Sequence, residues 1–330
     1  MIHDVLQLAR YASAPPMHGE QGEAVRALQV RLRDLGIPVG TVDGIAGDMT
    51  RGAWAVAKWR AGGGRLWWWE TRSAIRSLGA DGLLREAERY GVDHVAMMTN
   101  GIDGALGADW KLDESPSVYC EAADALHRSG IGAHLCPWVV REAGYLHDMC
   151  SALEGIADAA HIDSVQWDAE SPWYGYDHGM STAHAAEYLQ SWAESVDMRT
   201  GCTGYVYAPD DVHALAERCD YGVPQAYSQY DTGRESYTPG GLQSTALRKW
   251  RPHTDHLVMG LGAYRWSTTA PGWSSTPIAN LYRMIFDAVV HGVRDISVWS
   301  GWWVRKDDKI GDAFRILGES RGLVPKEGEA

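Results

Sequence analysis

Residues 161–170 read His-Ile-Asp-Ser-Val-Gln-Trp-Asp-Ala-Glu and follow a segment with the pattern of a helix. Polar and apolar side chains alternate along this stretch with the period of two that a strand requires. The alternation predicts that Gln166, Asp168 and Glu170 share one face of a strand, with apolar residues on the other. Three polar side chains on one face are uncommon in a core strand. The stretch is therefore either a solvated strand end or part of a catalytic site.

This stretch is the fourth of eight predicted units, each a strand followed by a helix, that run from residue 65 to the end of the chain. The predicted strands are residues 66–70, 94–99, 132–140, 162–170, 205–208, 222–227, 256–264 and 296–302. The predicted helices are residues 83–90, 118–129, 145–160, 182–196, 212–218, 242–250, 277–291 and 310–317. Eight units over roughly 255 residues are typical of an α/β fold, the (β/α)8 TIM barrel. A doubly wound open sheet is the alternative, but no Gly-x-Gly-x-x-Gly follows the first strand.

Residues 1–60 precede the predicted barrel and have the pattern of a small, separate all-α domain. One helix is predicted from apolar residues at helical spacing, namely Val25, Leu28, Leu32 and Leu35. A turn-rich loop follows, and Thr50 is placed to cap the next helix. The glycine-rich residues 61–64 have the composition of a flexible linker.

The order and spacing of these residues resemble a known module. Val25-x-x-Leu28-Gln29-x-x-Leu32-x-x-x-Gly36, then Asp43-Gly44-Ile45-x-Gly47-x-x-Thr50, is similar to the three-helix peptidoglycan-binding module of many cell-wall hydrolases. The resemblance implies that residues 1–60 bind peptidoglycan, and that the residues of the loop act as the anchor, namely Asp43, Gly44, Gly47 and Thr50.

Composition excludes several classes of protein. The 330 residues carry a formal net charge of −13 at pH 7, which disfavours a protein that binds nucleic acid or anionic membranes through a basic face. No apolar run reaches the length of a membrane span, and residues 1–4 do not begin a secretory signal. Five scattered cysteines suit a reducing compartment. We therefore expect a cytoplasmic, monomeric protein without membrane insertion.

The aromatic residues are unusual, with 16 Trp and 15 Tyr but only 2 Phe. Trp and Tyr combine an apolar face with a polar group, a combination that suits stacking on sugar rings. Codon bias against Phe is the alternative explanation.

A barrel assembles its active site from the carboxyl ends of its strands. Carboxylates ringed by Trp and Tyr are what hydrolysis of a glycosidic bond requires, because one carboxyl protonates the leaving oxygen and a second group assists. The candidate second carboxylates are Glu70, Glu142 and Asp231. The candidate substrate-binding residues are Gln166, Gln225, Trp138, Tyr264, Trp266, Trp299 and Trp302.

The fourth strand also resembles a family signature. Asp163-x-x-Gln166-x-Asp168-x-Glu170 is similar to the Asp-x-x-Asp-x-Asp-x-Glu of family-18 chitinases, with Gln in place of the middle Asp, and its Asp-x-Glu ending resembles family-25 lysozymes. Residues 225–228, Gln-Ala-Tyr-Ser, resemble the chitinase Met-x-Tyr-Asp and lack its Asp. The resemblance implies that Glu170 is the proton donor, that Asp168 tunes its pKa and positions the substrate, and that Tyr227 is a hydrogen-bonding partner.

The thirteen histidines show no zinc signature, since neither His-x-His on the first strand nor His-Glu-x-x-His occurs. His134, His161 and His184 are interpreted as structural. We expect neither a metal nor another cofactor.

Together the two resemblances imply a modular peptidoglycan hydrolase that cleaves the β-1,4 glycan strand, as a lysozyme (muramidase) or an N-acetylglucosaminidase does. The anchor-first order of domains resembles phage endolysins, which wait in the cytoplasm until they are released to the cell wall for bacteriolysis. Two alternatives remain: a glycan-binding barrel without activity, and an amidase or peptidase that acts on the stem peptide.

Overall fold

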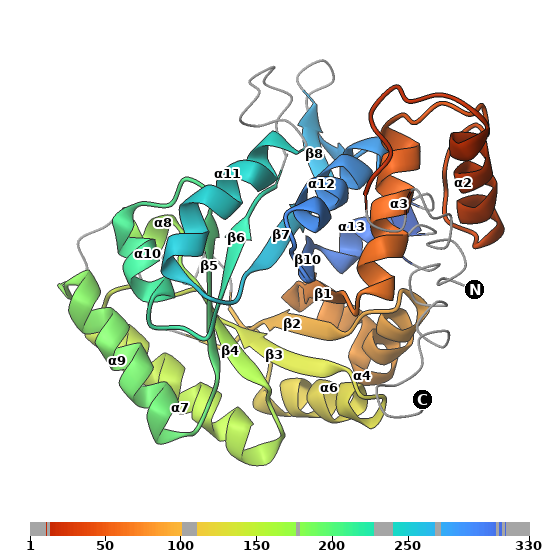
Figure 1. The fold of residues 1–330 in the computed structure, drawn as a ribbon. Helices are drawn as coiled ribbons and strands as arrows, with labels where there is room; N and C mark the ends of the chain where they lie inside the picture. The colour runs from red at the N-terminus through yellow and green to blue at the C-terminus, as the bar shows by residue number, and fades with distance from the viewer. Residues whose placement is uncertain are drawn as a thin grey trace, which may run out of the picture.

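A closed barrel of eight parallel strands forms the centre of the molecule, as the sequence predicts (Figure 1). The computed structural model describes residues 11, 14–100, 111–175, 179–227, 240–267, 272–307, 310–311 and 314, with the backbone alone at 265–267 and 272–275. Around the barrel, the strands follow the order β1-β10-β7-β6-β5-β4-β3-β2. They are β1 (Arg65–Glu70), β2 (His94–Met98), β3 (Gly132–Cys136), β4 (Ser164–Asp168), β5 (Thr200–Tyr205), β6 (Tyr221–Gln225), β7 (Val258–Gly262) and β10 (Asp295–Trp299).

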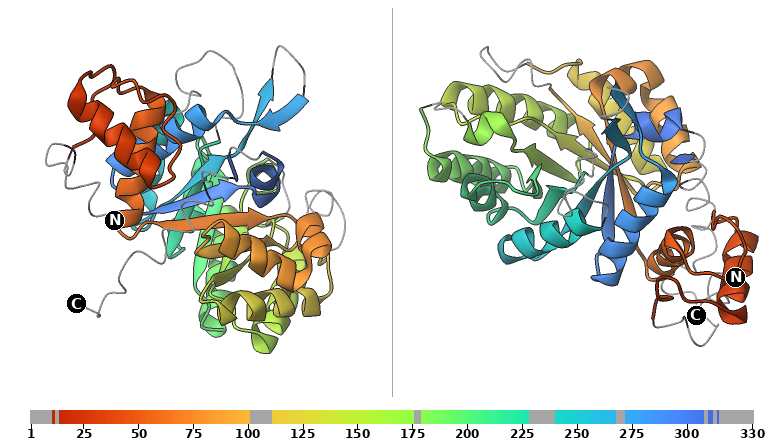
Figure 2. Two further views of the ribbon diagram at one scale, coloured as in Figure 1. Left: turned by 90° about the vertical axis from the view of Figure 1, so that its right-hand side faces the viewer. Right: turned by 90° about the horizontal axis from the view of Figure 1, so that it is seen from above.

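Helices surround the barrel and lie between consecutive strands (Figure 1). They are α4 (Arg72–Arg89), α6 (Pro116–Arg128), α7 (Ala143–Ala159), α8 (Ser171–Tyr174), α9 (Thr182–Ser195), α10 (Asp210–Ala216), α11 (Gly241–Trp250), α12 (Ile278–Val290) and α13 (Gly301–Lys306). A hairpin of β8 (Tyr264–Ser267) and β9 (Gly272–Ser275) projects from the barrel after β7 (Figure 2). None of the helices in the described ranges has the length and apolar composition needed to span a bilayer.

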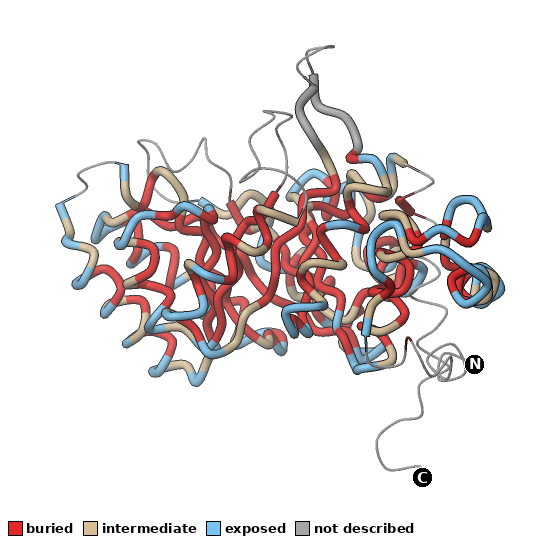
Figure 3. The backbone as a smooth tube through the Cα atoms, turned by 45° about the horizontal axis from the view of Figure 1, so that its top comes forward, coloured by how far each residue is buried: buried red, intermediate tan, exposed pale blue. Residues whose placement is uncertain are grey.

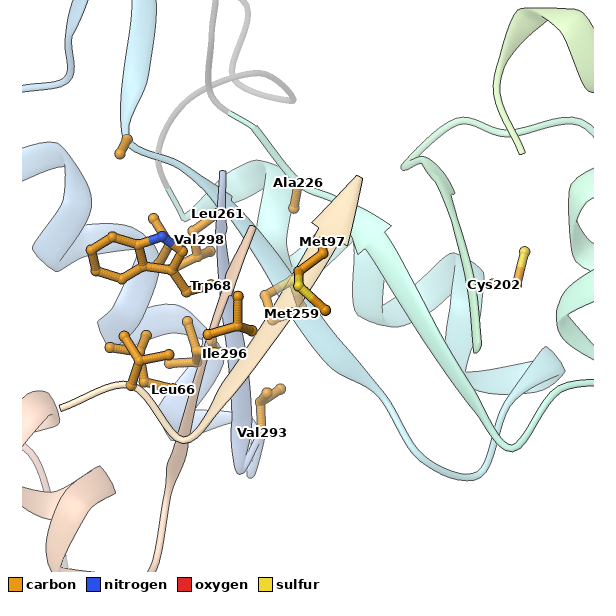
Figure 4. Packing of buried hydrophobic residues seen from close by; sticks show 14 of the residues in the cluster. Leu66, Trp68, Met97, Cys202, Ala226, Met259, Leu261, Val293, Ile296 and Val298 are labelled. Atoms are coloured by element: carbon orange, nitrogen blue, oxygen red, sulfur yellow. The ribbon is translucent and has the colours of Figure 1, made fainter. Parts of the chain in front are cut away.

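Strand β1 shows why a strand of this barrel can be apolar on both faces. Trp67 and Trp69 point into the barrel and pack in one buried cluster. Leu66 and Trp68 point outward instead, beside their β10 partners Ile296 and Val298 (Figure 4). A parallel strand covered on both faces has no polar side, and this removes the alternation seen in half-exposed strands.

Several predicted strand boundaries are wrong, including that of the third strand, which ends at Cys136 and not at residue 140. The fifth strand is Thr200–Tyr205 and not residues 205–208. The prediction missed it because its Thr-Gly-Cys-Thr-Gly-Tyr sequence lacks an apolar pattern. Its glycine at Gly201 is required by tertiary packing, since a Cβ there would lie 2.3 Å from the ring of Tyr221. The last strand ends at Trp299, and Trp302 lies in helix α13.

The described part of residues 1–60 contains two helices, α2 (Glu23–Asp34) and α3 (Asp48–Ala61), beside the barrel (Figure 1). Helix α3 packs along α12, and its Gly52 lies against the ring of Tyr282 so closely that a Cβ would be 2.1 Å from the side chain. Helix α2 lies further out and is more exposed (Figure 3). A three-helix domain with its boundary at residue 60 stays a prediction.

The connection between α3 and β1 is a short turn closed by hydrogen bonds. The N–H groups of Gly63 and Gly64 donate to the carbonyls of Arg60 and Trp59. Gly63 has a φ of 74°, which favours glycine, and a Cβ on Gly64 would collide with the Trp59 ring. Trp59 Nε1 also donates to the carbonyl of Arg294 at 2.6 Å. The glycines at 62–64 therefore form a hydrogen-bonded turn between helix and strand, and the flexible linker stays a prediction.

Candidate active site

A pocket of about 390 Å³ opens at the carboxyl ends of the barrel strands. Asp168 and Glu170 of the fourth-strand stretch line it, together with side chains from most of the other strand ends. The lining residues are Thr71, Arg72, Met98, Asn100, Trp138, Asp168, Glu170, Tyr205, Gln225, Tyr227, Tyr264 and Trp299.

Strand β4 supplies the two acids as its alternation predicts. Val165, Trp167 and Ala169 pack in the outer core, and Asp168 faces the pocket. Asp168 is 2 % exposed, whereas Glu170 follows the strand and is less buried. The acids therefore sit at two depths, with Asp168 beneath and Glu170 nearer the pocket mouth.

A single amide joins the two carboxyls. Gln225 Nε2, at the end of β6, donates to Asp168 Oδ1 at 3.2 Å and to Glu170 Oε1 at 2.8 Å. Tyr205 OH, at the end of β5, donates to Glu170 Oε2 at 3.2 Å. Neither donor carries a charge, and within the described residues no ion pair joins either acid to a cation. Gln225 was predicted to contact substrate, and its bonds here are to the acids.

Burial raises the pKa of both acids. For Asp168, loss of hydration raises the pKa well above its ordinary value, the negative charge of Glu170 raises it further, and hydrogen bonds from Trp138 and Gln225 oppose the rise. For Glu170, burial again raises the pKa, against hydrogen bonds from Gln225 and Tyr205. Two adjacent buried carboxyls of this kind retain a proton at a pH where isolated carboxyls have lost theirs.

Gln166 lies one step deeper on the same face of β4 and is fully buried. It does not line the pocket, and within the described residues neither polar atom of its amide has a hydrogen-bond partner. The predicted substrate contact at this position therefore has no direct support from the geometry, because Asp168 lies between Gln166 and the pocket.

The aromatic walls of the pocket come from four strand ends. The rings of Tyr227 and Trp299 are stacked with centroids 6.4 Å apart, and Tyr264 meets Tyr227 edge-on at 6.1 Å. Trp138 follows β3 and lies beside β4, forming a parallel bridge to Asp168. Four of the predicted aromatic residues thus share one pocket.

Several predicted site residues lie elsewhere. Glu70 points outward from β1 and is paired with Arg305, whose Nη2 lies 3.0 Å from Glu70 Oε2, so its charge is already neutralised. The carboxylate of Glu142 caps helix α7 and accepts the N–H groups of Gly144 and Tyr145. Neither of these carboxylates lines the pocket.

Trp302 is 44 % exposed on α13, where Lys306 Nζ lies 4.5 Å from its ring, and it is not part of the pocket wall. Strand β8 contains Trp266, whose side chain is outside the described residues, as is the whole of Asp231.

Sequence reasoning missed four polar residues that line the pocket, namely Thr71, Arg72, Asn100 and Tyr205. Tyr205 was placed at the start of a strand, and the shifted strand puts it at the carboxyl end, where it reaches Glu170. Asn100 follows β2, donates to Tyr145 OH at 2.7 Å and accepts the N–H of Trp138 at 2.8 Å, so it fixes the segment that carries the Trp138 ring. Correct assignment of the strand ends would have placed Tyr205 and Asn100 at the carboxyl end of the barrel.

The predicted anchor residues near the N-terminus build a loop. The Gln29 side chain donates to Asp43 Oδ1, to the carbonyl of Ile45 and to Thr50 Oγ1, each at 3.0 Å, and accepts the N–H of Gly44 at 2.8 Å. The residues that carry the resemblance therefore bond to one another. Gln29, at the centre of these bonds, is 1 % exposed. Gly47 precedes α3 as its N-cap residue.

No family model matches the chain, and no curated protein matches it either. Solved structures do resemble it. A chitinase from Chromobacterium violaceum shares 11 % identity with a TM-score of 0.51, covering 78 % of this chain and 99 % of its own. A GH113 β-1,4-mannanase shares 11 % identity with a TM-score of 0.53, covering 78 % of this chain and 97 % of its own.

A xylanase–α-amylase inhibitor protein, solved in complex with trehalose, shares 14 % identity with a TM-score of 0.54, covering 76 % of this chain and 97 % of its own. Enzymes and an inhibitor thus share this architecture. The similarity therefore defines a fold class, the (β/α)8 barrel, and function has to be argued from the site.

Proposed function

We propose that this protein is a glycoside hydrolase that cleaves the β-1,4 glycan strand of peptidoglycan. The observation that carries the proposal is the pair Asp168 and Glu170, buried together in an aromatic-lined pocket and bridged by the uncharged amide of Gln225. Structural ion pairs neutralise buried acids with cations, whereas acid catalysis needs a carboxyl that keeps its proton near neutral pH.

In this proposal Glu170 is the general acid, because it is the acid nearer the pocket mouth and its pKa is raised by burial. Its protonated carboxyl donates to the glycosidic oxygen as the bond to that oxygen breaks. Asp168 acts from beneath: its carboxyl disfavours a second charge on the pair before the reaction and stabilises positive charge that develops at the sugar afterwards.

In this proposal the aromatic residues bind the sugar. Tyr227, Tyr264 and Trp299 present ring faces and edges to the pocket, which suits the apolar faces of a pyranose. The pocket volume is at the lower end of the range for small-molecule sites and suits one or two sugar units at the reacting bond, with the remaining glycan strand outside.

Peptidoglycan as the substrate is supported by the N-terminal resemblance and by the loop that Gln29 organises. The expected cellular route, release to the cell wall as in phage endolysins, belongs to the same proposal. Replacing Gln29 with Leu keeps the side-chain volume and removes the bonds to the loop, while leaving the packing of α3 on α12. We expect weaker binding to whole sacculi and unchanged turnover of short soluble glycans, with the exposed Arg33→Gln on the same helix as control.

A second candidate is a glycan-binding barrel without catalytic activity. Gln166 and Ser228 favour it, since both replace acids of the chitinase pattern that the chain otherwise resembles. The amidase or peptidase alternative has no corresponding feature in the described pocket.

Mass spectrometry of digested, purified peptidoglycan tests the proposal directly. New reducing ends identify a glycosidase and name the bond that is cut. New free amines would instead identify an amidase or peptidase, and binding without either product would identify the inactive barrel.

A further inference from the structure

Three potential metal ligands converge at the amino-terminal end of the barrel, opposite the pocket. His127 lies in the last turn of α6, and His161 and Asp163 lie in the segment that connects α7 to β4. One ligand atom from each residue lies within 4.8 Å of the other two. Residues 36 positions apart are thus brought together by the packing of α6 beside the entry to β4.

The distances between these atoms suit a small cation. His127 Nε2 lies 2.8 Å from Asp163 Oδ2, and His161 Nε2 lies 3.7 Å from Asp163 Oδ1. A tetrahedral zinc ion bound at about 2.0–2.1 Å holds its ligand atoms about 3.3 Å apart. These two spacings bracket that value, and the third lies within 4.8 Å.

The carboxylate is held in position by the fold. Asp163 Oδ2 accepts the N–H of Ala133 in β3 at 2.7 Å, and the N–H of Asp163 donates to the carbonyl of Ala133. Such an outer bond orients a ligand before the metal arrives. His161 is the adjustable member, since its side chain is 75 % exposed and its ring centroid lies 4.7 Å from that of His127.

We propose that His127, His161 and Asp163 bind a divalent first-row transition metal, with zinc as the best fit to two imidazoles and one carboxylate. Exposure of His161 leaves a fourth position open to water, so an ion can enter without unfolding the protein. The bound ion would join the end of α6 to the start of β4, the strand that carries Asp168. Its role is to stabilise this end of the barrel, and it is independent of the proposed hydrolysis at the other end.

Zinc titration by calorimetry on the chelator-stripped, full-length protein tests the site. His161→Gln removes one ligand at an exposed position, where it leaves the fold intact. The matched control is His184→Gln, a substitution of an exposed histidine in helix α9. We expect one zinc ion per chain in the wild type and the control, and affinity weaker by at least about 10–100-fold in His161→Gln, the loss seen even for outer partners of metal ligands.

Thermal unfolding in zinc and in chelator gives a second measurement. The melting temperature should rise with zinc in the wild type and in His184→Gln, and should not respond in His161→Gln. Equal zinc affinity in the wild type and His161→Gln, or no binding above that of a histidine-free control protein, would overturn the proposal. The cluster would then be a hydrogen-bonded group that ties α6 to Asp163.

Discussion

The two ends of the barrel bury acids in opposite ways. At the amino-terminal end, Asp295 begins β10 and is 1 % exposed, and it bonds to Arg65 at 2.6 Å and to His256 at 2.5 Å. These bonds lower its pKa to about 2 although burial acts to raise it. At the carboxyl end, Asp168 and Glu170 have amide and hydroxyl donors, and burial raises the pKa of both.

The comparison shows that Asp295 and Asp168, which are buried to a similar degree, differ in the direction of their pKa shifts because their partners differ. An acid paired with cations stabilises the fold in its charged form. An acid surrounded by uncharged donors has a costly charged form, which makes it a proton donor at the expense of stability. Under the proposed function, Asp295 belongs to a stabilising site and the acid pair to a reactive site, and five substitutions test this distinction.

The largest effect is expected for Glu170→Gln, which retains the shape of the side chain and removes the proton. We expect kcat on peptidoglycan to fall at least about a hundredfold, the low end for general-acid catalysis. Because the raised pKa means that the folded state disfavours the charged carboxylate, the variant should be at least as stable as the wild type at pH 7. Steady-state kinetics measures the fall in kcat, and thermal unfolding measures the stability. Retention of more than about a tenth of wild-type turnover would show that Glu170 is not the acid.

Asp295→Asn should have the converse effect, a loss of stability with turnover per folded molecule unchanged. Its bonds to Arg65 and His256 are charge-assisted, and losing such bonds costs about 1.5–3 kcal/mol. Since folding lowers the pKa of Asp295 from 3.8 to about 2, its contribution is present above pH 4 and is lost as the pH falls through that interval. Denaturant unfolding at several pH values should show the wild type and the variant converging toward pH 2. A constant difference over that range would contradict the assignment.

Trp299 and Trp302 form a matched pair that separates the pocket wall from the surface. Trp299→Ala should lower kcat/KM by a factor equivalent to about 1–3 kcal/mol, by analogy with the stacking of bases on aromatic side chains. Trp302→Ala removes an exposed ring outside the pocket and should leave kcat/KM nearly unchanged. If both variants lost activity equally, the substrate would extend over α13.

The smallest effect is a shift in the pH profile of Asp168→Asn. The wild-type rate should fall at high pH as the acid pair loses its proton. With the neighbouring charge removed, the remaining carboxyl loses its proton more readily, and the basic limb should move to lower pH by on the order of one unit. Turnover should fall as well, because Asp168 faces the reacting sugar. An unmoved limb would mean that the two carboxyls titrate independently.

The sequence predicted what depends on local periodicity. The alternation in residues 161–170 was enough to place Asp168 on the inner face with Glu170 just beyond it, because side chains alternate along a strand whatever surrounds it. The repeated order of strand and helix was likewise enough to predict the barrel, since only a few architectures accommodate eight such units.

Tertiary structure decided everything that depends on residues distant in the chain. It placed β5 where Gly201 accommodates the ring of Tyr221, a contact that no local pattern encodes. It surrounded the two acids with uncharged donors, of which Gln225 is 57 positions from Asp168, and so set the direction of their pKa shifts. It also brought His127 to Asp163. A local pattern determines which way a side chain points, and only the folded chain determines what it meets there.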